Sequence, residues 1–411
     1  MPTLQLSGVL QDGDPPDVEG VATASGRRSV VAEELRQRLT PRLDAYGITR
    51  VAHLTGLDRL GVPVHTALKP QGRTLSSGSG KGVTKDASWV SAVMEAVEQS
   101  VWEGLGVSGV EATERGLREQ GRAVVSGDGL QKRRGALWSD RLPIMWCVGW
   151  DIVRGEDVWV PDSLVCFRDV GLSPFPSSSN GLASGATVLE AVLSALQEVI
   201  ERDGIALHSL VTRGPFVDAD AYLEEVEPEL SSLVTRAKVE MELIDATTEI
   251  GVPTFVCYLR DAPDERLGSF KGAGAGLTTA TALVRAVTEA AQGRTLVVAG
   301  ARDDIFRSMR RSSMGPRAVR TEPIRPVTHV APAGDAGCGT VAGDLTWMAG
   351  RLIAHGFDRI VVVRHTRPSD PVQVVRVIVP GLEGYPLAVA SPGRRAVEWE
   401  REQARSAAVT R

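Results

Sequence analysis

Three segments of the chain repeat one arrangement of oxygen-bearing side chains, spaced three residues apart in an otherwise apolar run. Residues i and i+3 lie on one face of a helix, so each segment predicts a helix that presents two oxygen ligands side by side. Three such helices could build an acidic, oxygen-lined cavity. The pairs are Glu95 and Glu98, Glu198 and Glu201, and Glu289 and Gln292.

A divalent metal ion is a suitable counter-charge for the first pair, because no Lys or Arg lies three or four residues from Glu95 or Glu98. Carboxylates among apolar groups need a compensating cation, and Mg²⁺ takes carboxylate oxygens together with substrate phosphates. The other two pairs have an alternative, since Arg202 and Arg285 can each neutralise one acid within the same helix. Any single pair could also lie on a solvated helix face, so the prediction depends on the threefold occurrence.

A glycine-rich segment precedes each predicted helix, at residues 76–82, 179–187 and 272–276. Glycine lets backbone amides converge on an anion, and the following helix N-terminus adds partial positive charge. These segments therefore predict phosphate-binding loops, although a tight turn uses the same residues. The first segment is not a Walker A motif, because neither Ser nor Thr follows Lys81.

Together these segments resemble the YcaO family over residues 70–390. The resemblance implies an enzyme that uses ATP and Mg²⁺ to phosphorylate the carbonyl oxygen of a peptide backbone amide, which turns that oxygen into a leaving group. The blocks that carry it are Ser79-Gly80-Lys81-Gly82, Ser91-x3-Glu95-x2-Glu98, Ser179-Asn180-Gly181-Leu182-Ala183, Glu190, Glu198-x2-Glu201-Arg202, Thr288-Glu289-x2-Gln292-x-Arg294, Arg302-x-Asp304 and Arg376-Val377-Ile378-Val379-Pro380-Gly381.

The same resemblance implies roles for individual residues. The metal ligands would be Glu95, Glu98, Glu198 and Glu201. The nucleotide contacts would be Lys81, Ser91, Glu190, Arg202, Glu289, Gln292, Arg294 and Arg376, of which Arg202 and Arg376 would also act in catalysis at the phosphates. The chain departs from the family pattern at Gln99, Ala183 and Ala186, where relatives have Arg, Ser and Asn. One phosphate or metal contact would therefore be missing or made elsewhere.

The first part of the chain distinguishes between chemistries within the family. Residues 46–64 resemble the opening of members that act with a TfuA-like partner to form thioamides, in which sulfide attacks the phosphorylated carbonyl. The same stretch could simply be a helix, a strand and a turn that cap the domain. Ring-forming relatives commonly carry a Pro-x-Pro-x-Pro tail, whereas residues 391–411 are charged and have no proline after Pro392.

We therefore expect thioamide formation in a ribosomally synthesised peptide or protein, with a TfuA-like partner and a sulfide donor. One alternative is an azoline- or amidine-forming cyclodehydratase of peptide natural products. Another is an ATP-binding accessory factor for methylthiolation of ribosomal protein S12.

Composition narrows the class of protein. The 411 residues carry a net charge of −5, so there is no overall basic field to attract nucleic acid. The four cysteines lie far apart without Cys-x-x-Cys spacing, so neither a zinc nor an iron–sulfur site is indicated. No apolar run approaches the roughly 20 residues that span a bilayer, so we expect a cytoplasmic protein that does not contact the membrane. A homodimer is left open.

The hydrophobic pattern predicts an α+β fold: a layered α/β sandwich with mixed or antiparallel sheets and three quasi-repeated glutamate-bearing helices around an ATP cleft. Strand-like apolar runs lie at residues 144–152, 158–161, 252–259, 359–365 and 372–379. The predicted divisions are a mobile N-terminal tail over 1–25, an N-terminal subdomain segment over 26–70, a YcaO domain over 71–390 and a charged C-terminal helix or tail over 391–411.

Overall fold

The computed structural model describes residues 2–15, 17, 19–104, 109–167, 173–210, 216–261, 268–301, 325–327, 339–385 and 389–409. The chain divides into two compact units, each assembled from separate stretches. Unit 1 comprises Met1–Glu19, Glu98–Val211 and Gly337–Arg411, and unit 2 comprises Gly20–Val97 and Thr212–Ala336. The sequence predicts instead one continuous domain over 71–390. The boundary falls within helix α2 (Lys85–Glu103), so that Glu95 belongs to unit 2 and Glu98 to unit 1.

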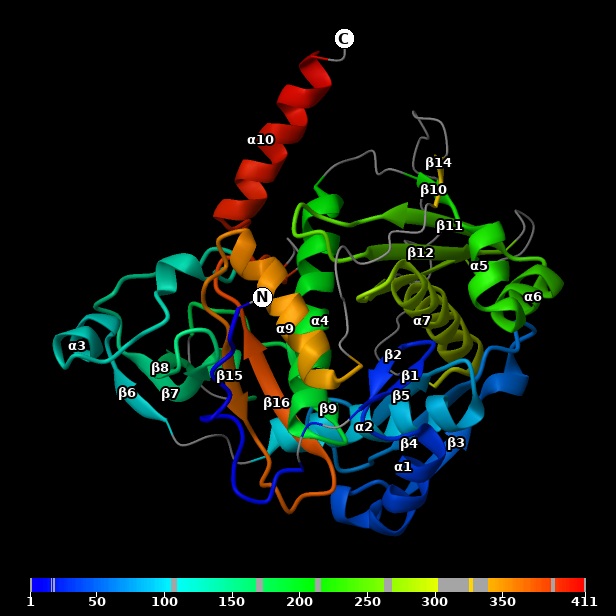
Figure 1. The fold of residues 1–411 in the computed structure, drawn as a ribbon, viewed down its shortest axis with the longest axis horizontal. Coiled ribbons are helices and arrows are strands. Elements are labelled where there is room, and N and C mark those ends of the chain that lie inside the picture. Colours follow the sequence, from blue (N-terminus) through cyan, green and yellow to red (C-terminus); the bar gives the residue numbers. More distant parts are fainter. Residues whose placement is uncertain are drawn as a thin grey trace. The chain divides into compact units, whose positions relative to one another are not determined.

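Unit 1 contains an antiparallel sheet with strand order β6-β7-β15-β16-β9, and β8 pairs with β7. The long helix α4 packs against β9 and β16, with α9 beside it (Figure 1). The elements are β6 (Val110–Ala112), α3 (Glu114–Glu119), β7 (Ile144–Asp151), β8 (Glu156–Pro161), β9 (Leu182–Gly185), α4 (Val188–Ser209), α9 (Val341–Ala354), β15 (Val361–Arg364), β16 (Gln373–Ile378) and α10 (Arg394–Val409).

The N-terminal segment, which the sequence predicts to be mobile, makes specific contacts within unit 1. The backbone N–H of Gln5 donates to the carbonyl of Ile152 at 2.7 Å, and the indole of Trp150 donates to the carbonyl of Gln5 at 2.6 Å. Asp14 forms a buried ion pair with Arg364, at 2.5 and 2.7 Å. This pair holds the pKa of Asp14 below its usual value, against the opposing effect of burial. These contacts favour an ordered segment over a freely mobile tail.

Unit 2 contains a five-stranded sheet of order β13-β12-β11-β10-β14, a three-stranded sheet β3-β4-β5 and a hairpin β1-β2. All pairs are antiparallel except β10 with β14. Helix α7 packs against β12 and β13 and also contacts β5. The elements are β1 (Val21–Thr23), β2 (Gly26–Arg28), α1 (Ala32–Leu39), β3 (Arg50–His53), β4 (Val64–Leu68), β5 (Ser77–Lys81), β10 (Phe216–Asp218), α5 (Asp220–Val226), α6 (Pro228–Ala237), β11 (Glu240–Asp245), β12 (Thr254–Arg260), β13 (Ser269–Ala275), α7 (Thr279–Ala299) and β14 (Arg325–Pro326).

The three predicted glutamate helices are α2, α4 and α7, and each follows a short strand that contains glycine. The expectation that the glycine-rich segments are loops is wrong, because much of each segment lies in β5, β9 or β13. Phosphate binding by these segments stays a prediction. Their glycines let the helix backbone approach the strand. A Cβ on Gly78 would lie 2.5 Å from the backbone N of Ala96, and one on Gly272 would lie 2.1 Å from that of Ala290. Ala96 and Ala290 each directly follow the first acid of their pair, so the two contacts are equivalent.

Two apolar clusters form the cores of the units. In unit 1, Trp146 and Phe175 are buried with valines of β8 and β15. In unit 2, the apolar face of α7 packs with residues of β11, β12 and α5. Among the described residues, no helix combines the length and apolar character needed to cross a membrane.

Candidate functional site

Arg376 is the most unusual charged group of unit 1. It lies on β16, is only 1% exposed, and its Nη1 donates to the carbonyl of Asn180 at 2.5 Å. Its Nε and Nη2 have no hydrogen-bond partner among the residues that the structure describes. Its Cζ lies 5.9 Å from the centre of the Trp102 ring. Buried N–H groups are costly when unpaired, so this guanidinium is suited to an anionic ligand that supplies the missing acceptors.

Acidic groups partly compensate the charge of Arg376. Burial lowers the pKa of its guanidinium, whereas Tyr385, Glu198, Cys166 and Glu98 act in the opposite direction. Burial also raises the pKa of the Tyr385 phenol, against the opposing effects of Arg376 and of a hydrogen bond with Ser178, so the phenol is neutral near pH 7. The net effect leaves a positive group in a dry setting, where its interaction with a phosphate would be strong.

Glu98, the second acid of the first pair, is tied to β9. Its Oε1 accepts from both the backbone N–H and the hydroxyl of Ser184, at 2.8 and 2.6 Å. On α4, Arg202 lies 3.7 Å from Glu198, as the sequence predicts for a pair in one helix. Glu201 is 5% exposed and so points away from bulk solvent. Three of the four predicted metal ligands thus belong to unit 1.

Glu190, a predicted nucleotide contact, lies in the first turn of α4 and is 4% exposed. Its backbone N–H donates to the hydroxyl of Thr187, which caps the helix. The partial positive charge of the helix N-terminus stabilises an acid in this first turn.

In unit 2, side chains of two helices hold β5 at its central residue, Ser79, and at its last residue, Lys81. Glu95 of α2 accepts from the backbone N–H of Ser79 at 3.1 Å, and Gln292 of α7 donates to the Ser79 carbonyl at 2.6 Å. Lys81 forms an ion pair with Glu289, with Nζ 2.7 Å from Oε2. The structure therefore brings together four predicted site residues: Lys81, Glu95, Glu289 and Gln292. Ser91 lies on α2 in the same unit.

Arg294 differs from the nucleotide contact that the resemblance implies. Its guanidinium is 1% exposed and binds the carboxylates of Asp58 and Asp261, at 2.8 and 2.6 Å. These two acids occupy the charged group, so the geometry favours a structural ion pair. The predicted motif Arg302-x-Asp304 lies outside the described residues.

Across the described stretches of chain, no three His, Cys, Asp or Glu side chains form a ready-made metal site. Such a group is not required for Mg²⁺, which typically uses one or two carboxylates and completes its shell with water and phosphate oxygens. The carboxylates of Glu98, Glu198 and Glu201 are the right donors, and the partnerless N–H groups of Arg376 suit the accompanying phosphate. The residues present therefore fit Mg²⁺ with a nucleotide, while the individual ligand assignments stay predictions.

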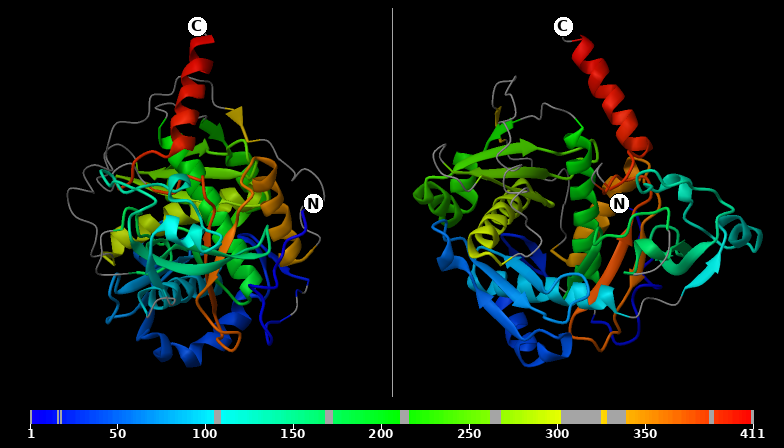
Figure 2. Two further views of the ribbon diagram at one scale, coloured as in Figure 1. Left: turned by 90° about the vertical axis from the view of Figure 1, so that its left-hand side faces the viewer. Right: turned by 180° about the vertical axis from the view of Figure 1, so that it is seen from behind.

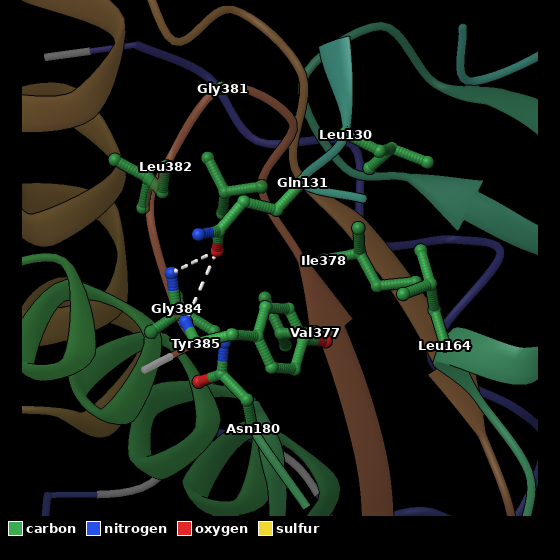
Figure 3. Close-up of a pocket in the computed structure, with 12 residues that line it drawn as sticks. Leu130, Gln131, Leu164, Asn180, Val377, Ile378, Gly381, Leu382, Gly384 and Tyr385 are labelled. Atoms are coloured by element: carbon green, nitrogen blue, oxygen red, sulfur yellow. Dashed lines mark hydrogen bonds between the residues drawn. The ribbon is translucent and has the colours of Figure 1, made fainter. Parts of the chain in front are cut away.

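A small cavity of about 50 Å³ is lined by the end of β16 and by the segment that follows it (Figure 3). Its walls include Val377, which follows Arg376 on β16, and Asn180, whose carbonyl accepts from Arg376. The side chain of Gln131 points toward the backbone of the segment after β16, and its Oε1 accepts from the N–H groups of Gly384 and Tyr385 at 3.0 and 3.1 Å.

Sequence reasoning did not single out Trp102, Gln131 or Tyr385. Asn180 belongs to one of the family blocks, but the resemblance implies no role for it. None of these residues has a spacing that signals its place. Trp102 and Asn180 meet Arg376 through long-range contacts, and Gln131 binds the backbone of Gly384 and Tyr385. The only local signal is the glycine-rich segment after β16, from Gly381 to Gly384, which allows close backbone packing.

The chain is similar to a known protein family and to several relatives. The family described as "YcaO cyclodehydratase, ATP- and Mg²⁺-binding" matches residues 79–383. A protein in the tfuA 3′ region of Rhizobium leguminosarum bv. trifolii is 37% identical over 379 residues, which cover 87% of this chain and 88% of that protein. A protein of Methanothermobacter thermautotrophicus is 31% identical over 393 residues, or 90% and 98% of the two chains.

Solved structures show the same fold. YcaO from Methanopyrus kandleri, bound with AMPPCP and Mg²⁺, has a TM-score of 0.71 at 23% identity and covers 92% of this chain and 98% of its own. A heterocyclase in complex with substrate and cofactor has a TM-score of 0.72 at 22% identity; 93% of this chain matches 55% of that one. The chain spans about half the length of that heterocyclase.

The chain belongs to the YcaO family, and ATP and Mg²⁺ are its cofactors. The resemblance and the α+β class predicted from the sequence are thereby confirmed.

Proposed function

We propose that the chain activates a peptide backbone amide with ATP and Mg²⁺ and converts it into a thioamide, together with a TfuA-like partner. The observation that carries amide activation is the buried guanidinium of Arg376. Its Nε and Nη2 lack a hydrogen-bond partner within the described residues. The negative charges of Glu198 and Glu98 favour the protonated guanidinium and raise its pKa, against the effect of burial. This combination suits a phosphate accompanied by a divalent cation.

The roles proposed for the residues are those that the family resemblance implies. Arg376 would donate to phosphate oxygens and stabilise the charge that develops on the transferring group. Glu95, Glu98, Glu198 and Glu201 would hold Mg²⁺, which supplies charge neutralisation at the phosphates. Further contacts to the nucleotide would come from Lys81, Ser91, Glu190, Arg202, Glu289 and Gln292. Arg294 is left out, because Asp58 and Asp261 already bind its guanidinium.

The proposed reaction balances without a redox step. The amide oxygen of the peptide attacks the γ-phosphorus of ATP, and ADP leaves. Sulfide then adds to the amide carbon, and the original oxygen departs with phosphate as the carbon–sulfur double bond forms. The carboxylates hold metal in this scheme and move no proton.

The thioamide product is supported by a relative. The Rhizobium protein is 37% identical to this chain and lies beside tfuA. Residues 46–64, which resemble the opening of TfuA-associated members, form β3, a short turn and the start of β4 in unit 2.

Ring formation is the second candidate, favoured by the family description as cyclodehydratases. In that case a Cys, Ser or Thr side chain of the substrate attacks in place of sulfide. The two products differ in composition, since a thioamide exchanges oxygen for sulfur and an azoline loses water.

The deciding experiment incubates the chain with Mg²⁺, ATP, sulfide, a TfuA-like protein and candidate peptides, and follows the peptides by mass spectrometry. We expect the mass gain of oxygen-to-sulfur exchange, dependent on ATP and sulfide and absent with Arg376→Met. Loss of water without sulfur incorporation would replace thioamidation by ring formation. Nucleotide binding without turnover on any peptide would favour the accessory role.

A further inference from the structure

The first turn of α10 is joined to α4 by a buried ion pair. Nε of Arg395 lies 2.9 Å from Oδ1 and 3.1 Å from Oδ2 of Asp203, and its Nη2 lies 2.9 Å from Oδ2. The Asp203 side chain is fully buried, and that of Arg395 is 15% exposed. Asp203 follows Glu201 by two residues on the same helix, so this ion pair acts on the helix that carries two proposed metal ligands.

A second buried acid, Glu383, completes the junction. Its Oε2 accepts from the N–H of Gly393 at 3.1 Å and its Oε1 from that of Ala396 at 3.0 Å, so it caps the N-terminus of α10. Its own backbone N–H donates to Asp203 at 2.9 Å. A Cβ on Gly393 would lie 2.3 Å from Oε1 of Glu383, so this cap needs glycine there.

From Glu383 the contacts lead directly to Arg376. The next residue, Gly384, packs so closely on Asn180 that a Cβ would lie 2.1 Å from its Nδ2. The carbonyl of Asn180 is the acceptor for Nη1 of Arg376. Tyr385 follows, and its phenol interacts electrostatically with Arg376 and Glu198. One short segment therefore touches α10 at one end and the surroundings of Arg376 at the other.

Beyond this junction, α10 has little contact with the rest of unit 1. Its second half extends away from α4 in every view (Figures 1 and 2), and residues 401–405 are all exposed. Trp399 makes an edge-on ring contact with His208 of α4, at 5.5 Å. The buried polar contacts of α10 are therefore concentrated where it meets α4 and Glu383.

We propose that the base of α10 is a positioning element of the nucleotide site: Arg395, through Asp203 and Glu383, holds α4 and the segment 380–385 so that Arg376 and Glu198 can bind Mg-ATP. The inference rests on the proposed role of Arg376 as a phosphate ligand. None of the three junction residues need touch the nucleotide. They act by fixing the backbone that carries the residues that do.

Hydrogen exchange tests the coupling in the unaltered chain. If docking of α10 favours nucleotide binding, nucleotide must favour docking of α10 by the same factor, because binding linkage is reciprocal. Saturating Mg²⁺ and AMPPCP should therefore slow amide exchange across residues 396–400 by about fivefold or more. Binding without added protection there overturns this inference alone. If AMPPCP does not bind at all, the proposed function fails, and this inference with it.

Variants of neighbouring arginines test the residue itself. At a temperature at which the variant is folded, Arg395→Ala should weaken Mg-AMPPCP binding by about tenfold. The reason is that the contacts of Asp203 and Glu383 loosen. Arg394→Ala is the matched control, since Arg394 is 90% exposed and pairs with Glu398 of its own helix. We expect its nucleotide affinity to stay within about twofold of the unaltered chain. Arg395→Lys keeps the charge but cannot bind both oxygens of Asp203 with a planar guanidinium. Its affinity for Mg-AMPPCP should therefore lie between those of the unaltered chain and Arg395→Ala.

A purely structural ion pair predicts a different outcome: a lower melting temperature for Arg395→Ala with an unchanged dissociation constant for Mg-AMPPCP. That result overturns the proposal. If Arg395→Ala does not fold, Glu383→Gln takes its place, because it keeps the side-chain volume and weakens only the cap. We expect Glu383→Gln to keep the circular dichroism spectrum of the unaltered chain and to bind Mg-AMPPCP more weakly. An unchanged affinity would count equally against the proposal.

Discussion

Gln292 donates a hydrogen bond to the carbonyl of Ser79 at 2.6 Å, and the direction of this bond explains why the third repeat carries an amide where the other two carry an acid. A carboxylate cannot donate to a carbonyl oxygen. The N–H of the same residue donates to Glu95, whose carboxylate oxygen accepts. The N–H and the carbonyl of Ser79 thus explain why α2 carries an acid at this contact and α7 carries an amide.

Gln292→Glu should therefore destabilise unit 2, because it replaces a donor by a negative acceptor facing the Ser79 carbonyl. We expect a loss of about 1–3 kcal/mol in the free energy of unfolding, measured by urea denaturation. Gln403→Glu makes the same change at an exposed position of α10 and should be nearly neutral. Equal stability of the two variants would contradict the assigned bond.

Arg376→Met should separate stability from function. The guanidinium is buried with two partnerless N–H groups among the described residues, and burial lowers its pKa, so its charge costs free energy in the ligand-free fold. An apolar side chain of similar length should leave stability unchanged or raise it by about 1 kcal/mol. Mg-AMPPCP binding, measured by calorimetry, should be lost. Retained binding in a stable variant would remove Arg376 from the site.

Arg294→Met should give the opposite pattern. Removal of this arginine takes a buried partner from Asp58 and leaves Asp261 with Arg59, so the free energy of unfolding should fall by about 3–5 kcal/mol. In the fraction that remains folded, the dissociation constant of Mg-AMPPCP should not change. A selective loss of nucleotide affinity at normal stability would restore Arg294 as a nucleotide contact.

Gly78→Ala should be poorly tolerated, because its Cβ would lie 2.5 Å from the backbone N of Ala96 and backbone atoms cannot move aside cheaply. We expect a loss of about 3 kcal/mol or more in thermal or urea unfolding. Gly56→Ala, also in unit 2, has no atom within 4 Å of its added Cβ and is the matched control. Similar stability of both variants would show that the helix can shift away from β5.

Acidification should weaken the fold through His365. Burial, followed by the charge of Arg376, lowers its pKa from 6.5 to about 4. The unfolded chain therefore binds more protons between about pH 6.5 and 4, so stability is full above pH 6.5 and is lost as the pH falls. By about pH 5, this effect should have lowered the free energy of unfolding by on the order of 2 kcal/mol relative to its value above pH 6.5.

His365→Gln, which does not titrate, should flatten this part of the pH profile of urea unfolding. His65 adds a slope of the same sign, since burial lowers its pKa to about 4 as well. An identical profile for the unaltered chain and His365→Gln would mean that His365 is protonated freely in the folded state.

The sequence predicts the secondary structure around the site well. Periodicity and spacing identify α2, α4 and α7, and the β-branched runs identify β12, β15 and β16. Glycine misleads, because Gly78 and Gly272 would look the same in a phosphate loop as in a strand that packs on a helix backbone. The sequence shows that a glycine has no side chain at that position. It does not show whether a phosphate or a helix backbone occupies the space.

Long-range ion pairs are the other part that sequence reasoning misses. Arg294 matches a family block, yet its partner Asp58 is 236 residues away. Arg395 and Asp203 are 192 residues apart. Such pairs depend on tertiary packing, for which charge and spacing in one chain give no signal.

The glycine contacts of β5 and β13 have a consequence for how the family can vary. Where strand and helix meet main chain to main chain, the separation between them does not depend on the size of any side chain. Substitutions in the surrounding apolar cores can then accumulate without moving the acids that directly precede these contacts. The placement of Glu95 and Glu289 is in this way insulated from drift in the rest of the sequence.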